Sequence, residues 1–155
     1  MEKLDSLNQV AEFHKTFNAP ILETPTIPSK ERCDLRVALL QEELDELKQA
    51  IADQNIVEIA DALCDLQYVL SGAVLEFGLG EKFAELFNEV QRSNMSKACT
   101  TQEEADATIE FYRNKGQEAY PEKSGEKINV HRKEDNKVLK SINYSPADLA
   151  SILNN

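Results

Sequence analysis

Acidic side chains gather in one stretch of the chain, from Glu42 to Asp65, where eight acidic residues accompany one basic residue, Lys48. Carboxylates at this density repel one another unless a cation or a partner offsets their charge. Their oxygen atoms are the ligands that hard divalent cations such as Mg²⁺ and Mn²⁺ prefer. The acids whose spacing matters are Glu42, Glu43, Glu46, Glu58, Asp61 and Asp65. We therefore interpret this stretch as a candidate metal site.

Two helices are expected to position these acids, one over residues 30–52 and one over residues 56–77, with a short polar break between them. On the first helix the glutamates fall within a sector of about 100°, opposite an apolar stripe. An acidic face of that kind is usually only solvated, so the first helix alone favours no site. On the second helix Glu58, Asp61 and Asp65 fall within a sector of about 60°. The rest of that helix is apolar, so we expect it to be buried, where carboxylates are costly unless they are paired or bound to metal.

The short break favours an antiparallel hairpin, which brings the two acidic faces level with each other. Counted from the break, Glu46 lies level with Asp61, and Glu43 with Asp65, at about 1.5 Å of rise per residue. Five or six carboxylates could then face one another and form an all-oxygen site for Mg²⁺ or Mn²⁺. A di-iron site is excluded, because neither of the two histidines follows a glutamate at Glu-x-x-His spacing.

Further helices are expected on either side of this hairpin. A proline-containing loop over residues 18–30 separates the first helix from the second. Thr101 and Glu104 form a predicted capping box at the start of the fifth helix. The expected helices cover about residues 6–17, 30–52, 56–77, 81–93 and 101–116.

The tail of the chain changes character. Residues 127–131 alternate polar and apolar side chains, which predicts a small β-hairpin with a turn at Asp135-Asn136 and a second strand at Val138-Leu139. Ser145-Pro146 then begins a short terminal helix. The expected fold class is all-α: a bundle of about four main helices with a small C-terminal β-hairpin and a short terminal helix. We expect one domain, with residues 1–120 as its helical part and residues 121–155 as an extension.

The composition narrows the classes of partner. The chain has 155 residues and a formal net charge of −11, which disfavours binding to nucleic acid and to anionic membranes. No apolar run approaches the roughly 20 residues of a membrane span, and the N-terminus lacks the pattern of a signal peptide. The three cysteines have no paired spacing and predict free thiols, as in a reducing cytoplasm.

The ordered acids resemble a known motif. Glu42-Glu43-x-x-Glu46 followed by Glu58-x-x-Asp61 is similar to the EExxE…ExxD motif of the all-α nucleoside triphosphate pyrophosphohydrolases, which include MazG-like enzymes and phosphoribosyl-ATP pyrophosphohydrolases. Phe13-His14 in the first helix also matches. The further matching segments are Glu89-Val90-x-x-Ser93-Asn94-Met95-Ser96-Lys97 and the tail segments Arg132-Lys133-Glu134-Asp135-x-Lys137-Val138-Leu139-Lys140-Ser141 and Tyr144-Ser145-Pro146-Ala147-Asp148-Leu149.

This resemblance implies hydrolysis of a nucleoside triphosphate between the α and β phosphates, which yields a nucleoside monophosphate and pyrophosphate. By similarity, Glu43, Glu46, Glu58 and Asp61 hold Mg²⁺, with Mn²⁺ as the alternative metal. Glu42 positions or deprotonates the attacking water. Asp65 is a further metal ligand or base, because the motif can also be placed one helical turn later. Residues 1–120 then form the metal- and nucleotide-binding part.

Substrate binding and assembly are also implied. Asn94 and Lys97 would reach the base, sugar or phosphate of the nucleotide. The apolar surface of the helix over residues 56–77, together with the habit of the superfamily, predicts a homodimer or a dimer of dimers. The alternative is a non-catalytic acidic helical module that binds metal or a protein partner. The two hypotheses differ in that an enzyme needs a pocket where the acids converge.

Overall fold

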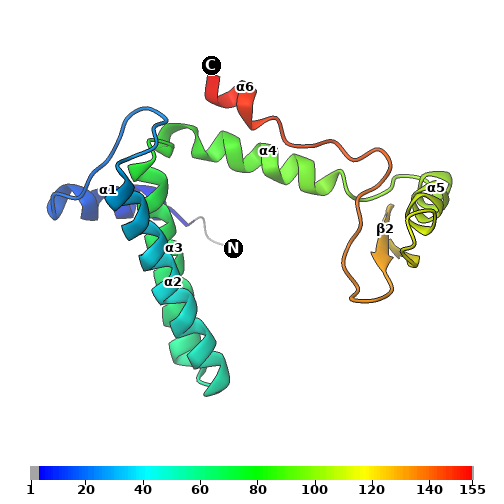
Figure 1. The fold of residues 1–155 in the computed structure, drawn as a ribbon, viewed down its shortest axis with the longest axis horizontal. Helices are drawn as coiled ribbons and strands as arrows, with labels where there is room; N and C mark the ends of the chain where they lie inside the picture. The colour runs from blue at the N-terminus through cyan, green and yellow to red at the C-terminus, as the bar shows by residue number, and fades with distance from the viewer. Residues whose placement is uncertain (1–3, 155) are drawn as a thin grey trace. The chain divides into compact units, whose positions relative to one another are not determined.

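The structure is a computed structural model that describes residues 4–154 (Figure 1). Its contacts divide the chain into two compact units, a first unit of residues 1–84 and a second unit of residues 85–155. Within the described residues the chain is mostly helical, with six α-helices and a two-stranded antiparallel sheet. The expected organisation, with residues 121–155 as an extension of one domain, stays a prediction.

The first unit is built on a helical hairpin. Its helices are α2 (Lys30–Ala52) and α3 (Ile56–Glu76), which pack side by side (Figure 1). At the reversal Gln54 adopts a positive φ of 54°, and the side chain of Asn55 caps α3 by accepting hydrogen bonds from the backbone N–H groups of Val57 (3.1 Å) and Glu58 (3.4 Å). The predicted helix bounds are confirmed to within one residue.

The proline-containing loop is tied to the end of α3. α1 (Ser6–Thr16) precedes the loop, and the backbone N–H groups of Leu22 and Thr26 donate to the carbonyl oxygens of Leu75 and Phe77, each at 3.0 Å. Gly78 stops α3 with a φ of +66°, and a Cβ atom at this position would stand 1.9 Å from the carbonyl oxygen of Thr24. The loop therefore requires glycine at this point.

A buried polar network joins the three helices. Glu76 is 1% exposed and accepts hydrogen bonds from Arg32 and Arg36 of α2. Burial by itself raises the pKa of the Glu76 carboxyl, but the hydrogen bonds from the two arginines outweigh it and hold the pKa below its ordinary value. His14 Nδ1 lies 2.8 Å from the carbonyl oxygen of Pro20, so we assign the ring proton to Nδ1 and leave Nε2 to accept from Arg36. His14 is thus a buried core residue.

The prediction that the second hairpin helix is buried on nearly every side is wrong for the single chain. Between residues 56 and 70, α3 exposes apolar side chains, because α2, joined by α1 at Gln67 and Tyr68, leaves part of this helix uncovered. Burial on most sides is confined to the segment from Ser71 to Glu76, where α1 and the loop also pack. The most exposed side chains are Ile56 at 74%, Val57 at 69% and Leu63 at 52%.

The second unit packs a helix against the small sheet. α4 (Phe83–Met95) begins at the end of the first unit, after a 3₁₀ turn at Gly80–Lys82, and α5 (Gln102–Arg113) packs on strands β1 (Ala119–Ser124) and β2 (Lys127–Arg132). The chain ends in the short helix α6 (Leu149–Asn154). The core of the second unit consists of Cys99, Ala105, Ala119, Val130 and Leu139.

The predicted β-hairpin exists, but the strand that pairs with residues 127–132 along their whole length is one that was not expected from the sequence. β2 pairs with β1, which precedes it, through a turn at Gly125 and Glu126. The expected partner at Val138-Leu139 makes a shorter contact on the other side of β2: an isolated bridge between His131 and Val138, and a hydrogen bond from the backbone N–H of Leu139 to the carbonyl oxygen of Val130 (2.7 Å). Pro121 lies within β1 and obscures the strand pattern, and it is tolerated because a two-stranded sheet has only edge strands.

The cap of α5 differs from a full capping box. Thr101 accepts a hydrogen bond from the backbone N–H of Glu104 (3.2 Å), as predicted, but the Glu104 carboxylate accepts from the backbone N–H of Thr100 (2.7 Å). The helix ends at Arg113, before the predicted stop at Gly116.

Among residues 4–154, no single helix has the length and apolar composition to cross a membrane. The bent pair Ile56–Glu76 and Gly80–Met95 meets the criterion when both helices are taken together, by length and composition only.

Candidate functional site

The predicted acids all lie on the two helices of the hairpin. Three of them come from α2 and three from α3, and the N-terminal cap at Asn55 fixes where α3 begins. Glu43 and Asp65 are half-buried. The exposed acids of the set are Glu42, Glu46, Glu58 and Asp61.

Electrostatics shows which of these acids are neighbours. The pKa of the Glu43 carboxyl is raised above its ordinary value, first by desolvation and then by the negative charges of Glu46, Asp65, Glu42 and Asp61. The hairpin register therefore brings acids of α3 to Glu43, as the spacing predicted. Asp65 acts on Glu43 more strongly than Asp61 does. Glu58 does not figure among these contributions.

The basic residue of the acidic stretch does not neutralise this cluster. Lys48 forms its ion pair with Asp45 at 2.7 Å, and the Gln41 amide also donates to Asp45. Hydrogen bonds from Lys48 and then Gln41 lower the pKa of Asp45 below its ordinary value. Asp45 lies outside the predicted set, so the acids around Glu43 keep their mutual repulsion.

The six predicted acids offer the kind of ligand atom that a hard cation prefers. All six acids offer carboxylate oxygens, and a divalent cation would relieve the repulsion that raises the pKa of Glu43. Across residues 4–154, however, no group of three or more His, Cys, Asp or Glu side chains is arranged closely enough to hold a metal ion. Binding would therefore require these exposed side chains to turn toward one another.

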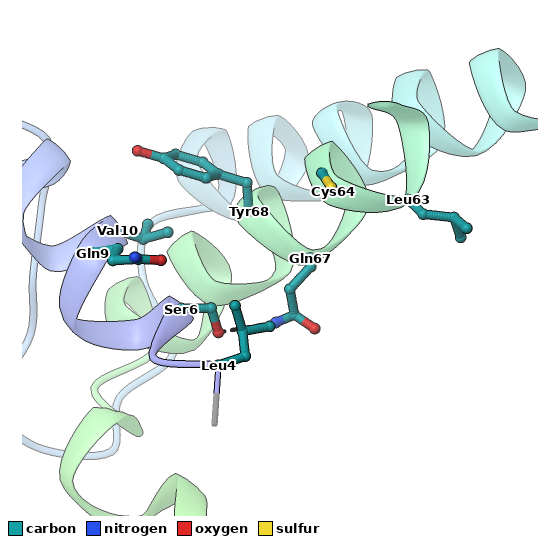
Figure 2. Close-up of a pocket in the computed structure, with 8 residues that line it drawn as sticks. All are labelled: Leu4, Ser6, Gln9, Val10, Leu63, Cys64, Gln67 and Tyr68. Carbon is teal, nitrogen blue, oxygen red and sulfur yellow. Dashed lines mark hydrogen bonds between the residues drawn. The ribbon is translucent and has the colours of Figure 1, made fainter. Parts of the chain in front are cut away.

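A mostly apolar pocket lies between α1 and α3 (Figure 2). Its volume is about 390 Å³. Cys64 and Tyr68 each stand three residues after an acid, Asp61 and Asp65, so one helical turn joins the pocket wall to the acidic face. The pocket is lined by Leu4, Ser6, Gln9, Val10, Leu63, Cys64, Gln67 and Tyr68.

Sequence reasoning missed this pocket. The amide of Gln67 donates to Ser6 Oγ at 3.3 Å and to Ser71 Oγ at 3.1 Å, which ties α3 to the first turn of α1. Tyr68 packs edge-on against Phe13 with ring centroids 5.6 Å apart. Apolar residues at helical spacing predict a packed core equally well, so only the polar Gln67 on an apolar helix could have indicated it.

Asn94 and Lys97 lie in the second unit, at the end of α4 and just after it. The Lys97 ammonium donates to Asn94 Oδ1 at 2.8 Å, so the two predicted substrate-binding residues are in contact with each other. Their approach to the acids of the first unit remains a prediction.

Comparison with known sequences places the acidic hairpin within a family. A profile described as phosphoribosyl-ATP pyrophosphohydrolase matches residues 10–94, which include α2, α3 and all six predicted acids. The chain belongs to this family. The resemblance inferred from the acidic motif is therefore confirmed.

A viral protein is also similar to part of the chain. An uncharacterised protein of Acanthamoeba polyphaga mimivirus is 33% identical to the chain over 82 residues, which is 50% of this chain and 33% of the viral protein. The chain thus corresponds to about a third of the length of that relative. Lys97 and the tail lie beyond the residues matched by the phosphoribosyl-ATP pyrophosphohydrolase profile.

Proposed function

We propose that the protein is a Mg²⁺-dependent nucleoside triphosphate pyrophosphohydrolase. It would cleave the bond between the α and β phosphates and release a nucleoside monophosphate and pyrophosphate. The observation that supports the proposal is the coincidence of the family match with the acidic hairpin, where the charges of four other carboxylates act on Glu43.

Four acids would hold the metal. Glu43 and Glu46 of α2 and Glu58 and Asp61 of α3 would supply oxygen ligands for Mg²⁺, with Mn²⁺ as the alternative. When bound, a divalent cation offsets the charge of the polyphosphate and polarises the phosphoryl group under attack. Asp65 is a further candidate ligand, supported by its half-buried position and its effect on Glu43.

Glu42 would act on the attacking water. It is exposed and lies about 40° from Glu46 and about 100° from Glu43 around α2, at the edge of the acidic cluster. From there its carboxylate would accept the proton of a water whose oxygen attacks the α phosphorus. The bond from that phosphorus to the bridging oxygen breaks, and pyrophosphate leaves.

Two other features would hold the substrate. Asn94 and Lys97 would bind its sugar or phosphates, and Lys97 would give an acidic protein a cation for that purpose. The pocket of Figure 2 would accept the apolar faces of the nucleoside next to Tyr68, one helical turn from the acids.

The exposed apolar side of α3 supports self-association. A homodimer or a dimer of dimers would cover side chains that the single chain leaves open, since large exposed apolar patches usually mark interfaces. The residues concerned on α2 and α3 are Leu44, Ile51, Ile56, Val57, Leu63 and Leu70. We also propose a cytoplasmic location, supported by the free thiols of Cys33, Cys64 and Cys99.

The deciding experiment is a screen of canonical and modified nucleoside triphosphates with Mg²⁺, in which monophosphate and pyrophosphate are quantified together. We expect equal amounts of the two products for at least one substrate and no turnover in EDTA. Release of orthophosphate in place of pyrophosphate would contradict the proposed bond cleavage.

A second candidate function is a non-catalytic acidic module that binds metal or a protein. The exposure of four of the acids favours it, because such side chains are also typical of a solvated face. Mg²⁺ binding without turnover of any triphosphate in the same screen would favour this module over the enzyme.

A further inference from the structure

Two lysines of the second unit converge on one tyrosine. Lys97 follows α4, while Lys140 and Tyr144 belong to the tail between β2 and α6. The Lys140 ammonium stands 4.3 Å from the centroid of the Tyr144 ring, and the charges of both Lys140 and Lys97 act on the tyrosine hydroxyl. Asn94 joins the group through its hydrogen bond with Lys97.

Buried hydrogen bonds hold the tail in this position. Ser141, which is 4% exposed, donates its hydroxyl proton to the buried Glu104 carboxylate of α5. Its backbone N–H donates to the carbonyl oxygen of Lys97 at 3.1 Å, and the backbone N–H of Tyr144 donates back to the Ser141 carbonyl at 2.9 Å. The side chains that converge are therefore placed by a fixed backbone.

The donors of this group are available to an anion. Ser93, 4% exposed, donates its hydroxyl to the Tyr144 oxygen at 3.0 Å, which leaves the phenolic O–H free to donate elsewhere. The Asn94 carbonyl oxygen accepts from Lys97, which leaves the amide NH₂ group to donate.

The local charge is positive although the chain is strongly acidic. Within the part of the chain that the structure describes, neither Lys97 nor Lys140 forms an ion pair with a carboxylate, whereas the nearby Arg92 is paired with Glu89 at 2.7 Å. The pKa of the Tyr144 hydroxyl is lowered by the hydrogen bond from Ser93 and, against the effect of burial, by the charges of Lys140 and Lys97. A negatively charged oxygen is therefore stabilised at this place.

We propose that Lys140 and Tyr144 form, with Lys97 and Asn94, a binding site for phosphate groups, and that the tail thereby contributes to binding of the nucleotide's phosphates. The second clause rests on the proposed function, since it takes the ligand to be a triphosphate. Two ammonium groups, one phenolic O–H and one amide supply donors of the kind that phosphate oxygens accept.

The test uses the full chain with inorganic pyrophosphate as the probe, in EDTA, so that the acidic cluster cannot take up a metal–pyrophosphate complex. Calorimetric titration measures the dissociation constant. Lys140→Gln should weaken binding by about tenfold, as expected for loss of one charge-assisted hydrogen bond. Tyr144→Phe keeps the ring beneath Lys140 but removes the hydroxyl, and it should weaken binding by a smaller factor of roughly threefold to tenfold.

The matched control is Lys137→Gln. It removes the same charge from the same tail, but the charge of Lys137 acts on Asp135 and is not among those that act on the Tyr144 hydroxyl. It should change the dissociation constant less than twofold. Equal weakening by Lys137→Gln and Lys140→Gln would show a long-range charge effect and overturn the site, and so would the absence of pyrophosphate binding by the unmodified chain.

The outcome is separable from that of the proposed function, because pyrophosphate binding is measured without turnover. If the chain binds pyrophosphate through Lys140 but hydrolyses no triphosphate, the phosphate site stands and the proposed enzyme fails. If the chain hydrolyses a triphosphate with Mg²⁺ while Lys140→Gln and Tyr144→Phe leave pyrophosphate binding unchanged, the phosphate site is overturned alone.

Discussion

Glu42 and Glu46 lie one helical turn apart on α2 and have different proposed roles, so they offer a direct test at the scale of single residues. Glu42→Gln keeps the size of the side chain and removes its basicity. We expect kcat to fall by about 10²–10⁴-fold, the usual contribution of a general base, with little change in Mg²⁺ affinity. Glu46→Gln should weaken Mg²⁺ binding as well. The measurement is a Mg²⁺ titration of initial rates at one nucleotide concentration; comparable loss of Mg²⁺ affinity in both variants would identify Glu42 as a ligand.

Asp61 and Asp65 compete for the last ligand position of the motif. Asp65 is half-buried and acts on Glu43 more strongly, whereas the motif spacing favours Asp61. We expect Glu58→Gln and Asp61→Asn to abolish turnover while the far-ultraviolet circular dichroism stays helical. If Asp61→Asn is active and Asp65→Asn is inactive, the last ligand of the motif is Asp65, one helical turn later on α3. If Glu58→Gln and Asp61→Asn are both fully active, the acids form only a solvated face.

At the scale of elements, the tail is fastened to α4 by Glu89. Its carboxylate accepts hydrogen bonds from Arg92 and from the backbone N–H of Asp148 (2.8 Å), which lower the pKa of Glu89 to about 2. A depressed folded-state pKa contributes stability above the unfolded value of about 4.5, and this stability is lost as the pH falls toward about 2. The backbone amides of Asp148 and Ser151 should therefore lose protection over that range, so that their hydrogen exchange becomes faster relative to the intrinsic chemical rate at each pH.

Glu89→Gln provides the control for this pH dependence. It removes the titrating group, so exchange at the same amides should already be fast at pH 7 and should show no further acceleration, beyond the intrinsic chemical rate, below pH 4.5. If wild-type and variant exchange profiles coincide at every pH, Glu89 does not fasten the tail.

The helices were predictable from the sequence because residues close to each helix end determine where the helix begins and stops. Asn55 and Thr101 cap helices, Gly78 stops one, and apolar residues recur at helical spacing. The pairing of β2 with β1 was not predictable in this way, since Pro121 and the charged residues around it hide the strand. Contacts between distant parts of the chain, and not local sequence signals, determine this strand pairing.

One neighbour relation within the acidic cluster was predictable in a similar way. Spacing along two helices was enough to place Glu43 near Asp65, because a short reversal fixes the hairpin register. The group formed by Lys97, Lys140 and Tyr144 was not foreseen. It depends on a tail that is tied to α5 by the buried pair Ser141 and Glu104 and that reaches α4 through the hydrogen bond between Ser93 and Tyr144. Contacts between residues so far apart in the sequence leave no periodic pattern from which they could be predicted.

For the whole molecule, the repulsion around Glu43 predicts stabilisation by metal. A cation that binds the folded chain and not the unfolded one raises the free energy of unfolding. At a Mg²⁺ concentration of about 100 times Kd we expect the melting temperature to rise by roughly 5–10 °C. Differential scanning calorimetry with and without EDTA measures this, and Glu43→Gln together with Glu46→Gln should remove most of the increase. An unchanged melting temperature at millimolar Mg²⁺ would count against the metal site.

Self-association is the second prediction for the whole molecule. If a second copy covers α3, Leu63→Glu places a charge in the interface and should shift the protein to a monomer. Light scattering after size exclusion measures the mass directly. Lys15→Glu, on the exposed surface of α1, is the control for added negative charge and should leave the mass unchanged. A wild-type protein that elutes as a monomer at micromolar concentration would contradict the prediction.

The close approach of Gly78 to Thr24 also limits which substitutions can accumulate at position 78 during evolution. Any side chain at position 78 would have to displace a backbone carbonyl, whereas a Cβ atom at Gly116, another glycine of positive φ, would meet nothing within 4 Å. In a library that samples every codon at both positions, Gly116 should yield functional clones with asparagine or aspartate, while position 78 should return glycine alone. Both glycines have a positive φ, but only Gly78 should be unable to accept a substitution.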